Sequence, residues 1–239
     1  MNETRENKGH GNEAPQADAA PTVVVFDIGE VLIDESRVWR IWAELVGVSE
    51  LTFGAVLGAA ISQGLDIADA FEHVAPNVDW REFEDEHERR YGGFVEDDLY
   101  ADARPCLTDL RAAGVVTVLA GNQPERRAQQ LRALNLPVSQ IVTSAELGHE
   151  KPDSSFFAAL RTFLTDAGIE VDDPAQLLYV GDRVDNDVIP AADAGMRTCW
   201  IRRGPWGQLQ DNDAIEPDLL LEGLGELPTL LADWETSEA

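Results

Sequence analysis

Lysine and cysteine are both scarce in this chain of 239 residues. Lys8 and Lys151 are the only lysines among 18 basic residues, a bias that fits either a GC-rich coding sequence or a salt-adapted host. The two cysteines, Cys106 and Cys199, fall on expected core elements without a metal-ligand spacing, so buried, reduced thiols are the simpler interpretation. No apolar run approaches the roughly 20 residues that span a bilayer, and no amino-terminal pattern indicates a secretory signal. We therefore expect a cytoplasmic protein.

Positively charged residues are also few. The chain has 45 acidic residues against 18 basic ones, which gives a net charge of −27. A balance of this sign argues against nucleic acid and against anionic membrane surfaces as partners. The apolar content of 44% is ordinary for a globular protein, and the length allows one large domain or a domain with an insertion.

The hydrophobic pattern changes twice along the chain. Residues 1–21 are polar and lack periodicity, which predicts a disordered tail. Residues 36–99 show helical periodicity without a convincing buried strand, and after residue 100 strand-like and helical segments alternate. Strands are expected at Thr22–Asp27, Val115–Ala120, Gln140–Thr143, Leu177–Val180, Arg197–Ile201 and Asp218–Leu221. Core helices are expected at 104–113, Glu125–Leu134, Ser154–Asp166, Asp185–Ala194 and Leu224–Ala232.

Strands that alternate with helices predict an α/β fold with a doubly wound, parallel, Rossmann-like sheet. We assign residues 22–35 and 100–239 to this core domain. The helical block 36–99 is then an inserted, all-helical cap domain above the carboxyl edge of the sheet.

Two of the expected strands end in an aspartate. The run Val23–Phe26 leads into Asp27, and another apolar run ends in Gly181-Asp182. Apolar, β-branched runs are typical of buried parallel strands, and open α/β sheets bind their ligands at the carboxyl edge. Two aspartates delivered to that edge can share one divalent cation, and one of them can also attack a phosphorus atom. This pattern favours an enzyme.

Four segments, each near the end of an expected strand, carry a family resemblance: FDIGEVLID, VLAGNQPE, GHEKPDSSFF and YVGDRVDNDVIPAADAGM. In this order they resemble the haloacid dehalogenase-like (HAD) hydrolase superfamily, and specifically its members with a helical C1-type cap. The resemblance implies a Mg²⁺-dependent phosphatase that acts on a small phosphorylated metabolite through an aspartyl-phosphate. We expect neither nucleic acid nor a membrane as partner, and a monomer or a homodimer.

The resemblance also assigns roles to individual residues. Asp27 matches the nucleophile, and Lys151 matches a lysine that neutralises both nucleophile and phosphate. Mg²⁺ would be bound by Asp27, Asp182 and the backbone carbonyl of Gly29, while Asp187 would bind through water or orient the other ligands. Two or three protein oxygens suffice because Mg²⁺ keeps several of its waters.

Position 29 departs from the family pattern. Most phosphatases of the superfamily carry a second aspartate where this chain has Gly29, and that aspartate protonates the leaving group. Loss of such an acid costs about 10²–10⁴-fold in rate. The simplest consequence is a preference for anomeric or acyl phosphates, whose leaving groups barely need a proton. The adjacent Glu30 is an open alternative as the acid, although neighbouring loop side chains usually point apart.

Position 121 departs as well. Gly121 stands where the family places a serine or threonine that binds the phosphoryl group, when the segments are aligned through Asn122. The backbone N–H groups of Gly121 and Asn122 remain as an anion-binding nest, and a plain strand-to-helix turn is the competing interpretation.

These two losses leave a second hypothesis open, namely a catalytically weak or inactive phospholigand-binding or regulatory protein. Dehalogenation is disfavoured because the acidic motif GDRVDND is intact. The cap should select the substrate, and one or two of its candidate residues are expected to face the site. These candidates are Arg37, Trp39, Trp42, His73, Trp80, Arg89, Arg90 and Tyr91. The segment 202–206 follows an expected strand, so a place at the border of the active site is open for it, and a surface turn is the simpler interpretation.

Overall fold

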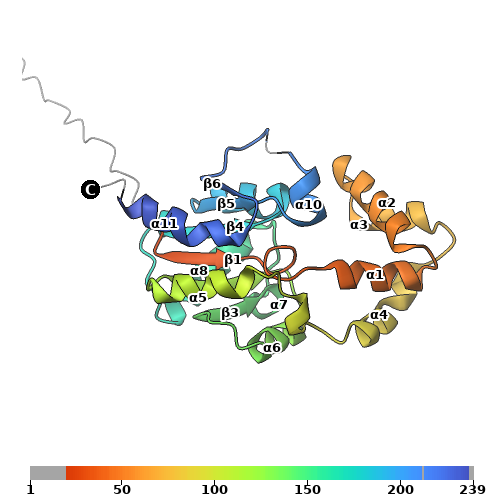
Figure 1. Cartoon of the computed structure of the whole chain (residues 1–239), viewed down its shortest axis with the longest axis horizontal. Helices are drawn as coiled ribbons and strands as arrows, with labels where there is room; N and C mark the ends of the chain where they lie inside the picture. Colours follow the sequence, from red (N-terminus) through yellow and green to blue (C-terminus); the bar gives the residue numbers. More distant parts are fainter. Residues whose placement is uncertain (1–19, 212, 237–239) are drawn as a thin grey trace, which may run out of the picture.

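A six-stranded parallel sheet forms the centre of the molecule, with the strand order β3-β2-β1-β4-β5-β6 (Figure 1). The computed structural model describes residues 20–211 and 213–236, so most of the tail expected at residues 1–21 lies outside the described residues. The strands are β1 (Val23–Phe26), β2 (Val116–Gly121), β3 (Gln140–Thr143), β4 (Leu177–Gly181), β5 (Arg197–Ile201) and β6 (Leu219–Leu221).

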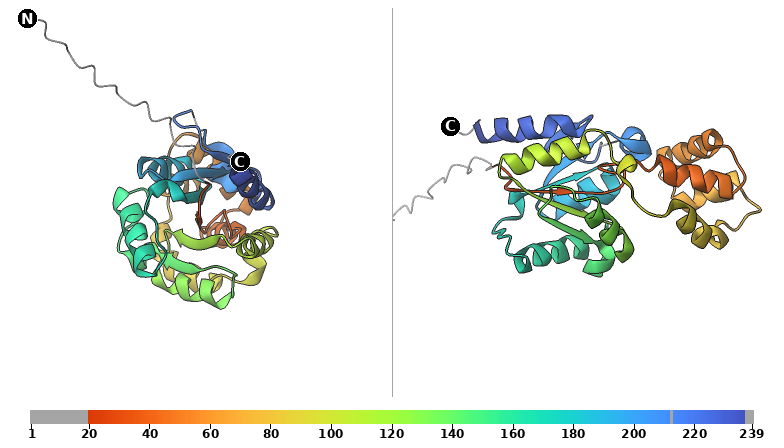
Figure 2. Two further views of the ribbon diagram at one scale, coloured as in Figure 1. Left: turned by 90° about the vertical axis from the view of Figure 1, so that its left-hand side faces the viewer. Right: turned by 60° about the horizontal axis from the view of Figure 1, so that its bottom comes forward.

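Helices cover both faces of this sheet, as the right-hand view of Figure 2 shows. One face carries α5 (Ala103–Ala112) and α11 (Leu227–Thr236), and the opposite face carries α8 (Ser154–Asp166) and α9 (Ile189–Asp193). The remaining core elements are α6 (Glu125–Ala133), α7 (Ser144–Leu147), α10 (Gly204–Leu209), the π-helical turn η4 (Val184–Val188) and the 3₁₀ turns η3 (Pro174–Gln176) and η5 (Leu224–Glu226).

The alternation of side chains along β1 explains these two layers. Val24 and Phe26 point into the cluster shared with α5 and α11, whereas Val23 and Val25 point into the cluster shared with α8. All four are at most 2% exposed, so both faces of the strand are buried. A strand buried on both faces is continuously apolar, which is the pattern seen in the sequence.

The parallel register aligns the ends of the central strands. Phe26 of β1 pairs with Leu119 of β2 and with Val180 of β4. The ladder continues by one residue, because the backbone N–H of Asp27 donates to Val180 at 2.9 Å. The residues that follow β1, β2 and β4 therefore lie side by side at the carboxyl edge.

The cap extends beyond this edge (Figure 1). It comprises α1 (Ser36–Leu45), α2 (Glu50–Ser62), α3 (Ile67–Val74) and α4 (Glu84–Tyr91), with 3₁₀ turns η1 (Trp80–Phe83) and η2 (Glu96–Asp98). Its own apolar cluster includes Phe53, Leu57 and Phe71. Within the described residues no single helix is long and apolar enough to cross a membrane, although α1 and α2, bent by 110°, meet the length and composition criteria as a pair.

The expected fold class is confirmed, with the helical cap inserted after β1. The helix predicted for Asp185–Ala194 is present, although it begins as a π-helical turn and becomes α-helical only at Ile189. The surface-turn interpretation of 202–206 was wrong. This segment leads into α10, where proline lies at the helix start and Trp206 is buried in the cap cluster. The indole of Trp206 is buried by residues far away in the sequence, and local turn signals do not predict such a contact. The limits 36 and 99 for the cap domain stay a prediction.

Candidate active site

Three buried carboxylates meet at the carboxyl edge of the sheet. Asp27 directly follows β1, Asp182 directly follows β4, and Asp187 lies in the turn η4. One oxygen from each of these carboxylates lies within 4.8 Å of the other two. The three residues are 9%, 2% and 0% exposed, respectively, so they form a compact acidic centre that is almost closed to solvent.

Lys151 is the counter-ion of this cluster. Its Nζ lies 2.8 Å from Oδ1 of Asp27 and 2.6 Å from Oδ1 of Asp187. Asn122, which follows β2, holds the lysine loop with two hydrogen bonds of 2.8 Å. Its Nδ2 donates to the carbonyl of Lys151, and its Oδ1 accepts from the backbone N–H of Lys151. The side chain of Asn122 thus positions Lys151. The backbone N–H of Asn122 remains for the predicted contact with phosphate.

Two glycines make room for the carboxylates. A Cβ built on Gly121 would collide with Oδ1 of Asp27, and a Cβ built on Gly181 would collide with the side chain of Asp187. Both glycines are the last residues of their strands, β2 and β4. A serine or threonine at position 121 would therefore require the carboxylate of Asp27 to shift from the place it has in this structure.

Burial and repulsion make the cluster costly to ionise. Burial raises the pKa of Asp27 to about 6, although the charge of Lys151 opposes the rise. Burial, followed by the charges of Asp187 and Asp27, raises the pKa of Asp182 well above its ordinary value. Burial alone would lower the pKa of Lys151, but the carboxylates of Asp187 and Asp27 outweigh it and raise that pKa. Further positive charge would favour full ionisation of the aspartates.

The cluster has the chemistry of a divalent cation site. Lys151 pairs with two of the three carboxylates, Asp27 and Asp187, so full ionisation leaves uncompensated negative charge in a buried place. Among the described residues, none donates a hydrogen bond to the carboxylate of Asp182, which is 2% exposed. Gly29, the predicted backbone ligand, lines the same cavity. Oxygen donors of this kind are those that Mg²⁺ prefers, so the residues present fit this ion.

A cavity of about 230 Å³ opens onto Asp27, Lys151 and Asp182. Two indoles form much of its apolar wall: Trp39 comes from α1 of the cap and Trp206 from α10 of the core, and their ring centres are 5.9 Å apart. The other lining residues are Gly29, Glu30, Glu35, Val38, Ile67, Asn122, Gln123, Arg183 and Asn186. The cavity therefore has a charged floor from the core and an apolar wall shared by core and cap.

Most of the cap residues named as candidates have structural contacts instead. Trp39 is the one of the eight that lines this cavity in the described part of the chain. The guanidinium of Arg37 pairs with Asp98 at 2.5 Å and lies 4.0 Å from the ring centre of Tyr91. The ring of Trp42 stacks on the buried His87, with 4.3 Å between the ring centres.

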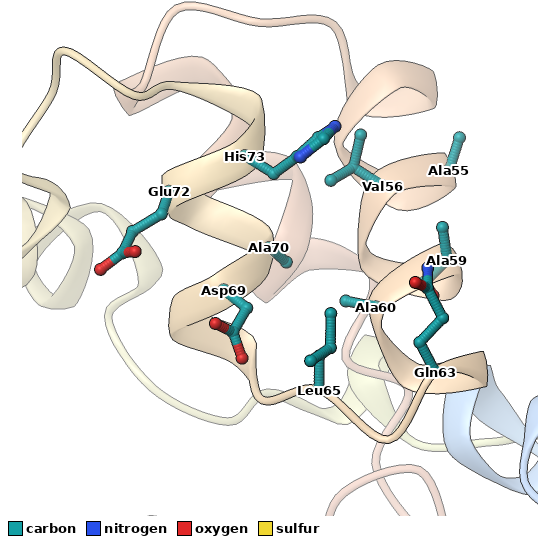
Figure 3. Close-up of a pocket in the computed structure, with 10 residues that line it drawn as sticks. All are labelled: Ala55, Val56, Ala59, Ala60, Gln63, Leu65, Asp69, Ala70, Glu72 and His73. Carbon is teal, nitrogen blue, oxygen red and sulfur yellow. The ribbon is translucent and has the colours of Figure 1, made fainter.

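A second, larger cavity of about 540 Å³ lies within the cap between α2 and α3 (Figure 3). It is lined largely by small and apolar side chains such as Val56, Ala60 and Leu65, with His73 at its rim. It shares no lining residue with the cavity at Asp27. Because the acidic centre and the lysine open onto the smaller cavity, we place the chemistry there.

Two glutamates also line the smaller cavity. Glu30 accepts a hydrogen bond from the hydroxyl of Tyr100 at 2.5 Å, and burial raises the pKa of Glu30 to about 7. Glu35 immediately precedes α1 and is half-buried. Burial, followed by the charges of Glu30 and Asp27, raises the pKa of Glu35 to about 8.

The structure brings the predicted site residues together at one edge. Asp27, Gly29, Asn122, Lys151 and Asp182 line the cavity. Asp187 lies below them in the cluster, and Gly121 packs against the nucleophile candidate. Their roles stay predictions. Sequence reasoning missed Glu35, Gln123 and Arg183 as lining residues. Gln123 and Arg183 lie within the quoted motif segments, which could have pointed to them, whereas no local pattern distinguishes Glu35 from a surface residue.

Comparison with known proteins identifies the class. The family model for haloacid dehalogenase-like hydrolases matches residues 21–195, and the chain belongs to this family. The predicted resemblance to this family and the assignment as a hydrolase are thereby confirmed, and the C1 type of the cap stays a prediction.

Curated relatives that match the chain are phosphatases by name. The chain is 34% identical to the glyceraldehyde 3-phosphate phosphatase of Methanopyrus kandleri over 134 residues, which cover 54% of each protein. It is 32% identical to the phosphoserine phosphatase of Thermus thermophilus over 132 residues, 54% of this chain and 49% of that protein. The matched segment thus spans about half the length of these relatives.

Solved structures share the fold over most of the chain. The HAD-hydrolase YfnB from Bacillus subtilis, bound to magnesium, has a TM-score of 0.69 at 18% identity and covers 89% of this chain and 99% of its own. The L-2-haloacid dehalogenase from Xanthobacter autotrophicus has a TM-score of 0.63 at 18% identity, with 89% and 98% covered. Because both neighbours are only 18% identical to this chain and differ in name, the likeness shows the shared fold alone.

Proposed function

We propose that this protein is a Mg²⁺-dependent phosphatase of a small phosphorylated metabolite, with Asp27 as the nucleophile. The observation that carries the proposal is the 2.8 Å pairing of Asp27 with Lys151 inside a buried cluster of three carboxylates. The intact acidic cluster favours phosphoryl transfer over dehalogenation, and the phosphatase names of the curated relatives point to the same substrate class.

The chain's own residues supply most of the proposed reaction. A carboxylate oxygen of Asp27 attacks phosphorus, the bond to the leaving oxygen breaks, and water then cleaves the aspartyl-phosphate. Lys151 orients the nucleophile and neutralises the oxygens of the transferring group, while Asn122 fixes the lysine loop. Mg²⁺ held by Asp27, Asp182 and the carbonyl of Gly29 would supply further charge neutralisation and orient the phosphate.

The cap has a separate role in this proposal. Trp39 and Trp206 face the cavity from opposite domains, so a substrate between them would be shielded from bulk water. Exclusion of water strengthens the electrostatic contacts of Lys151 with the phosphoryl group.

The test measures phosphate release from a panel of acyl, anomeric, aryl and alkyl phosphates, with and without Mg²⁺. We expect Mg²⁺-dependent turnover that falls roughly 10⁴–10⁶-fold in Asp27→Asn. The exposed Asp193→Asn on α9 is the matched control and should keep wild-type activity. Calorimetric binding of Mg²⁺ and mass-spectrometric detection of phosphate on Asp27 give readouts that do not depend on turnover.

Other outcomes would reject the proposal. Equal activity in wild type and Asp27→Asn would indicate a contaminating phosphatase. Binding of a phosphorylated ligand without turnover of any member of the panel would instead support the phospholigand-binding hypothesis.

A further inference from the structure

The carboxyl group of Glu35 occupies the space that a side chain at position 29 would fill. A Cβ built on Gly29 would lie 2.5 Å from Oε1 and 2.9 Å from Cδ of Glu35. Glu35 reaches this place from the residue before α1, six positions further along the chain. The glycine therefore leaves room beside the nucleophile, and a carboxyl group from another part of the backbone takes it.

Glu35 is not committed to another structural contact. It stands at the N-cap position of α1, yet its side chain makes no capping hydrogen bond. Within residues 20–211 and 213–236, no side-chain or backbone group donates a hydrogen bond to its carboxylate. The residue is half-buried and lines the same cavity as Asp27. A carboxyl group so placed is free to contact whatever occupies the cavity.

Glu30, the other candidate for an acid, is held differently. Its carboxyl group accepts the hydroxyl hydrogen bond of Tyr100 at 2.5 Å. The same carboxyl group packs on Gly204, where a Cβ would lie 2.6 Å from its Cδ. Glu30 thus braces the loop after β1 against α10, whereas the carboxyl group of Glu35 has no such ties.

We propose that Glu35 is the proton donor for the leaving group in the reaction of Asp27. In the first step, an oxygen of Asp27 forms a bond to phosphorus, the bond from phosphorus to the leaving oxygen breaks, and the Glu35 carboxyl proton passes to that oxygen. In the second step, the oxygen of a water molecule forms a bond to phosphorus, and the Glu35 carboxylate accepts a proton from that water. The bond from phosphorus to Asp27 breaks, which releases phosphate and restores the aspartate.

This inference rests on the proposed phosphatase function and deepens it. Without a donor, the enzyme would favour acyl and anomeric phosphates, as expected from Gly29 alone. With Glu35 as donor, it also hydrolyses alkyl phosphates, whose leaving groups need a proton. The two expectations therefore differ in the substrates that the wild-type protein accepts.

The first experiment compares wild type, Glu35→Gln and the exposed cap control Glu82→Gln on a series of phosphates with increasingly basic leaving groups. The rate constant kcat/KM reports steps through the formation of the aspartyl-phosphate. For Glu35→Gln we expect a loss of about 10²–10³-fold with an alkyl phosphate but less than about 3-fold with 4-nitrophenyl phosphate. Glu82→Gln should match wild type throughout.

The second experiment moves the carboxyl group back to position 29. Glu35→Ala should lose turnover of alkyl phosphates. The double variant, Gly29→Asp with Glu35→Ala, should hydrolyse alkyl phosphates at least about tenfold faster than Glu35→Ala alone. Gly29→Asp alone should not improve on wild type, because its side chain would collide with Glu35. Thermal unfolding of each variant shows whether it remains folded.

The outcomes separate the two proposals. If wild type has no Asp27-dependent turnover of any phosphate, the proposed function fails. If wild type is active but Glu35→Gln loses the same factor on every leaving group, the role of Glu35 as donor is overturned. The same follows if Glu30→Gln, and not Glu35→Gln, shows the dependence on leaving group.

Discussion

The carboxyl edge of the core and the wall of the cap border the same cavity, but they hold their side chains by different means. At the edge, Asp27 and Asp182 follow adjacent strands whose register is fixed by backbone hydrogen bonds, and Lys151 joins Asp27 directly. The wall depends on packing between Trp39 and Trp206, which belong to different domains. The charged floor thus lies on strands joined by backbone hydrogen bonds, whereas the apolar wall depends on side-chain packing between the core and the cap.

This difference predicts that changes at the edge affect the reaction itself. Lys151→Met should lower kcat/KM about 10³-fold, because it removes the counter-ion of the nucleophile and of the transferring phosphate. It also leaves Asp27 and Asp187 without their partner, which should cost about 3–5 kcal/mol in the free energy of unfolding. Steady-state kinetics and urea denaturation measure the two effects, with the exposed Arg111→Met as control. A variant with near wild-type kinetics would remove Lys151 from the proposed mechanism.

Asp182→Asn tests the cation site. We expect Mg²⁺ affinity, measured by calorimetry, to fall by about 10–100-fold, since one of the oxygen ligands loses its charge. Without Mg²⁺ the variant should melt at a higher temperature than wild type near pH 8, because burial opposes ionisation of this aspartate. Unchanged affinity for Mg²⁺ would contradict the assignment of Asp182 as a ligand.

Gly121→Ser restores the residue type that the family usually has, and so sharpens the comparison. A Cβ at this position would collide with Oδ1 of Asp27. We therefore expect the serine to displace Asp27 and to lower kcat by about 10-fold, a loss at the lower end of what misplaced catalytic groups cost. An increase in kcat would show instead that Asp27 can shift and that the missing hydroxyl limits the wild-type enzyme.

Trp206→Phe probes the wall between the domains. The smaller ring should cost about 1–2 kcal/mol of stability and raise KM by several fold, with kcat nearly unchanged. Kinetics with the best substrate of the panel provide the measurement. A selective fall in kcat would mean that α10 positions the charged floor as well as the wall.

The prediction for Glu30→Gln concerns stability alone, measured as the dependence of unfolding on pH in the absence of Mg²⁺. Burial raises the pKa of Glu30 from 4.5 to about 7, so the folded protein binds this proton more tightly than the unfolded chain. The resulting stabilisation is complete below pH 4.5 and is lost as pH rises through 7. Wild type should therefore lose about 1–3 kcal/mol more than Glu30→Gln between pH 5 and 8. Parallel pH profiles of the two proteins would contradict this account.

Much of the core and its site could be predicted from local patterns. The strands Gln140–Thr143 and Arg197–Ile201 and the helix Ser154–Asp166 have the predicted limits. Their apolar periods and turn residues are local, so the sequence carries them. The same applies to Asp27 and Asp182, because a strand that ends in a carboxylate delivers it to a known edge.

The contacts between domains could not be predicted in this way. Trp206 was expected in a surface turn, yet it packs into the cap cluster. Glu35 was not singled out at all, because its importance depends on the empty space at Gly29 and on the path of the chain into α1. Neither fact has a local signature in the sequence.

The sequence by itself determined a parallel α/β core, an inserted helical block and the order of the acidic and basic residues along the strand ends. These follow from hydrophobic period and from the side-chain types that close each strand. Only the tertiary structure decided that Asp187 shares Lys151 with Asp27, that Gly121 makes room for Asp27 and that Glu35 fills the space beside Gly29. Such pairings join residues far apart in the chain or across a turn, and their distances are set by how the elements pack rather than by any local preference.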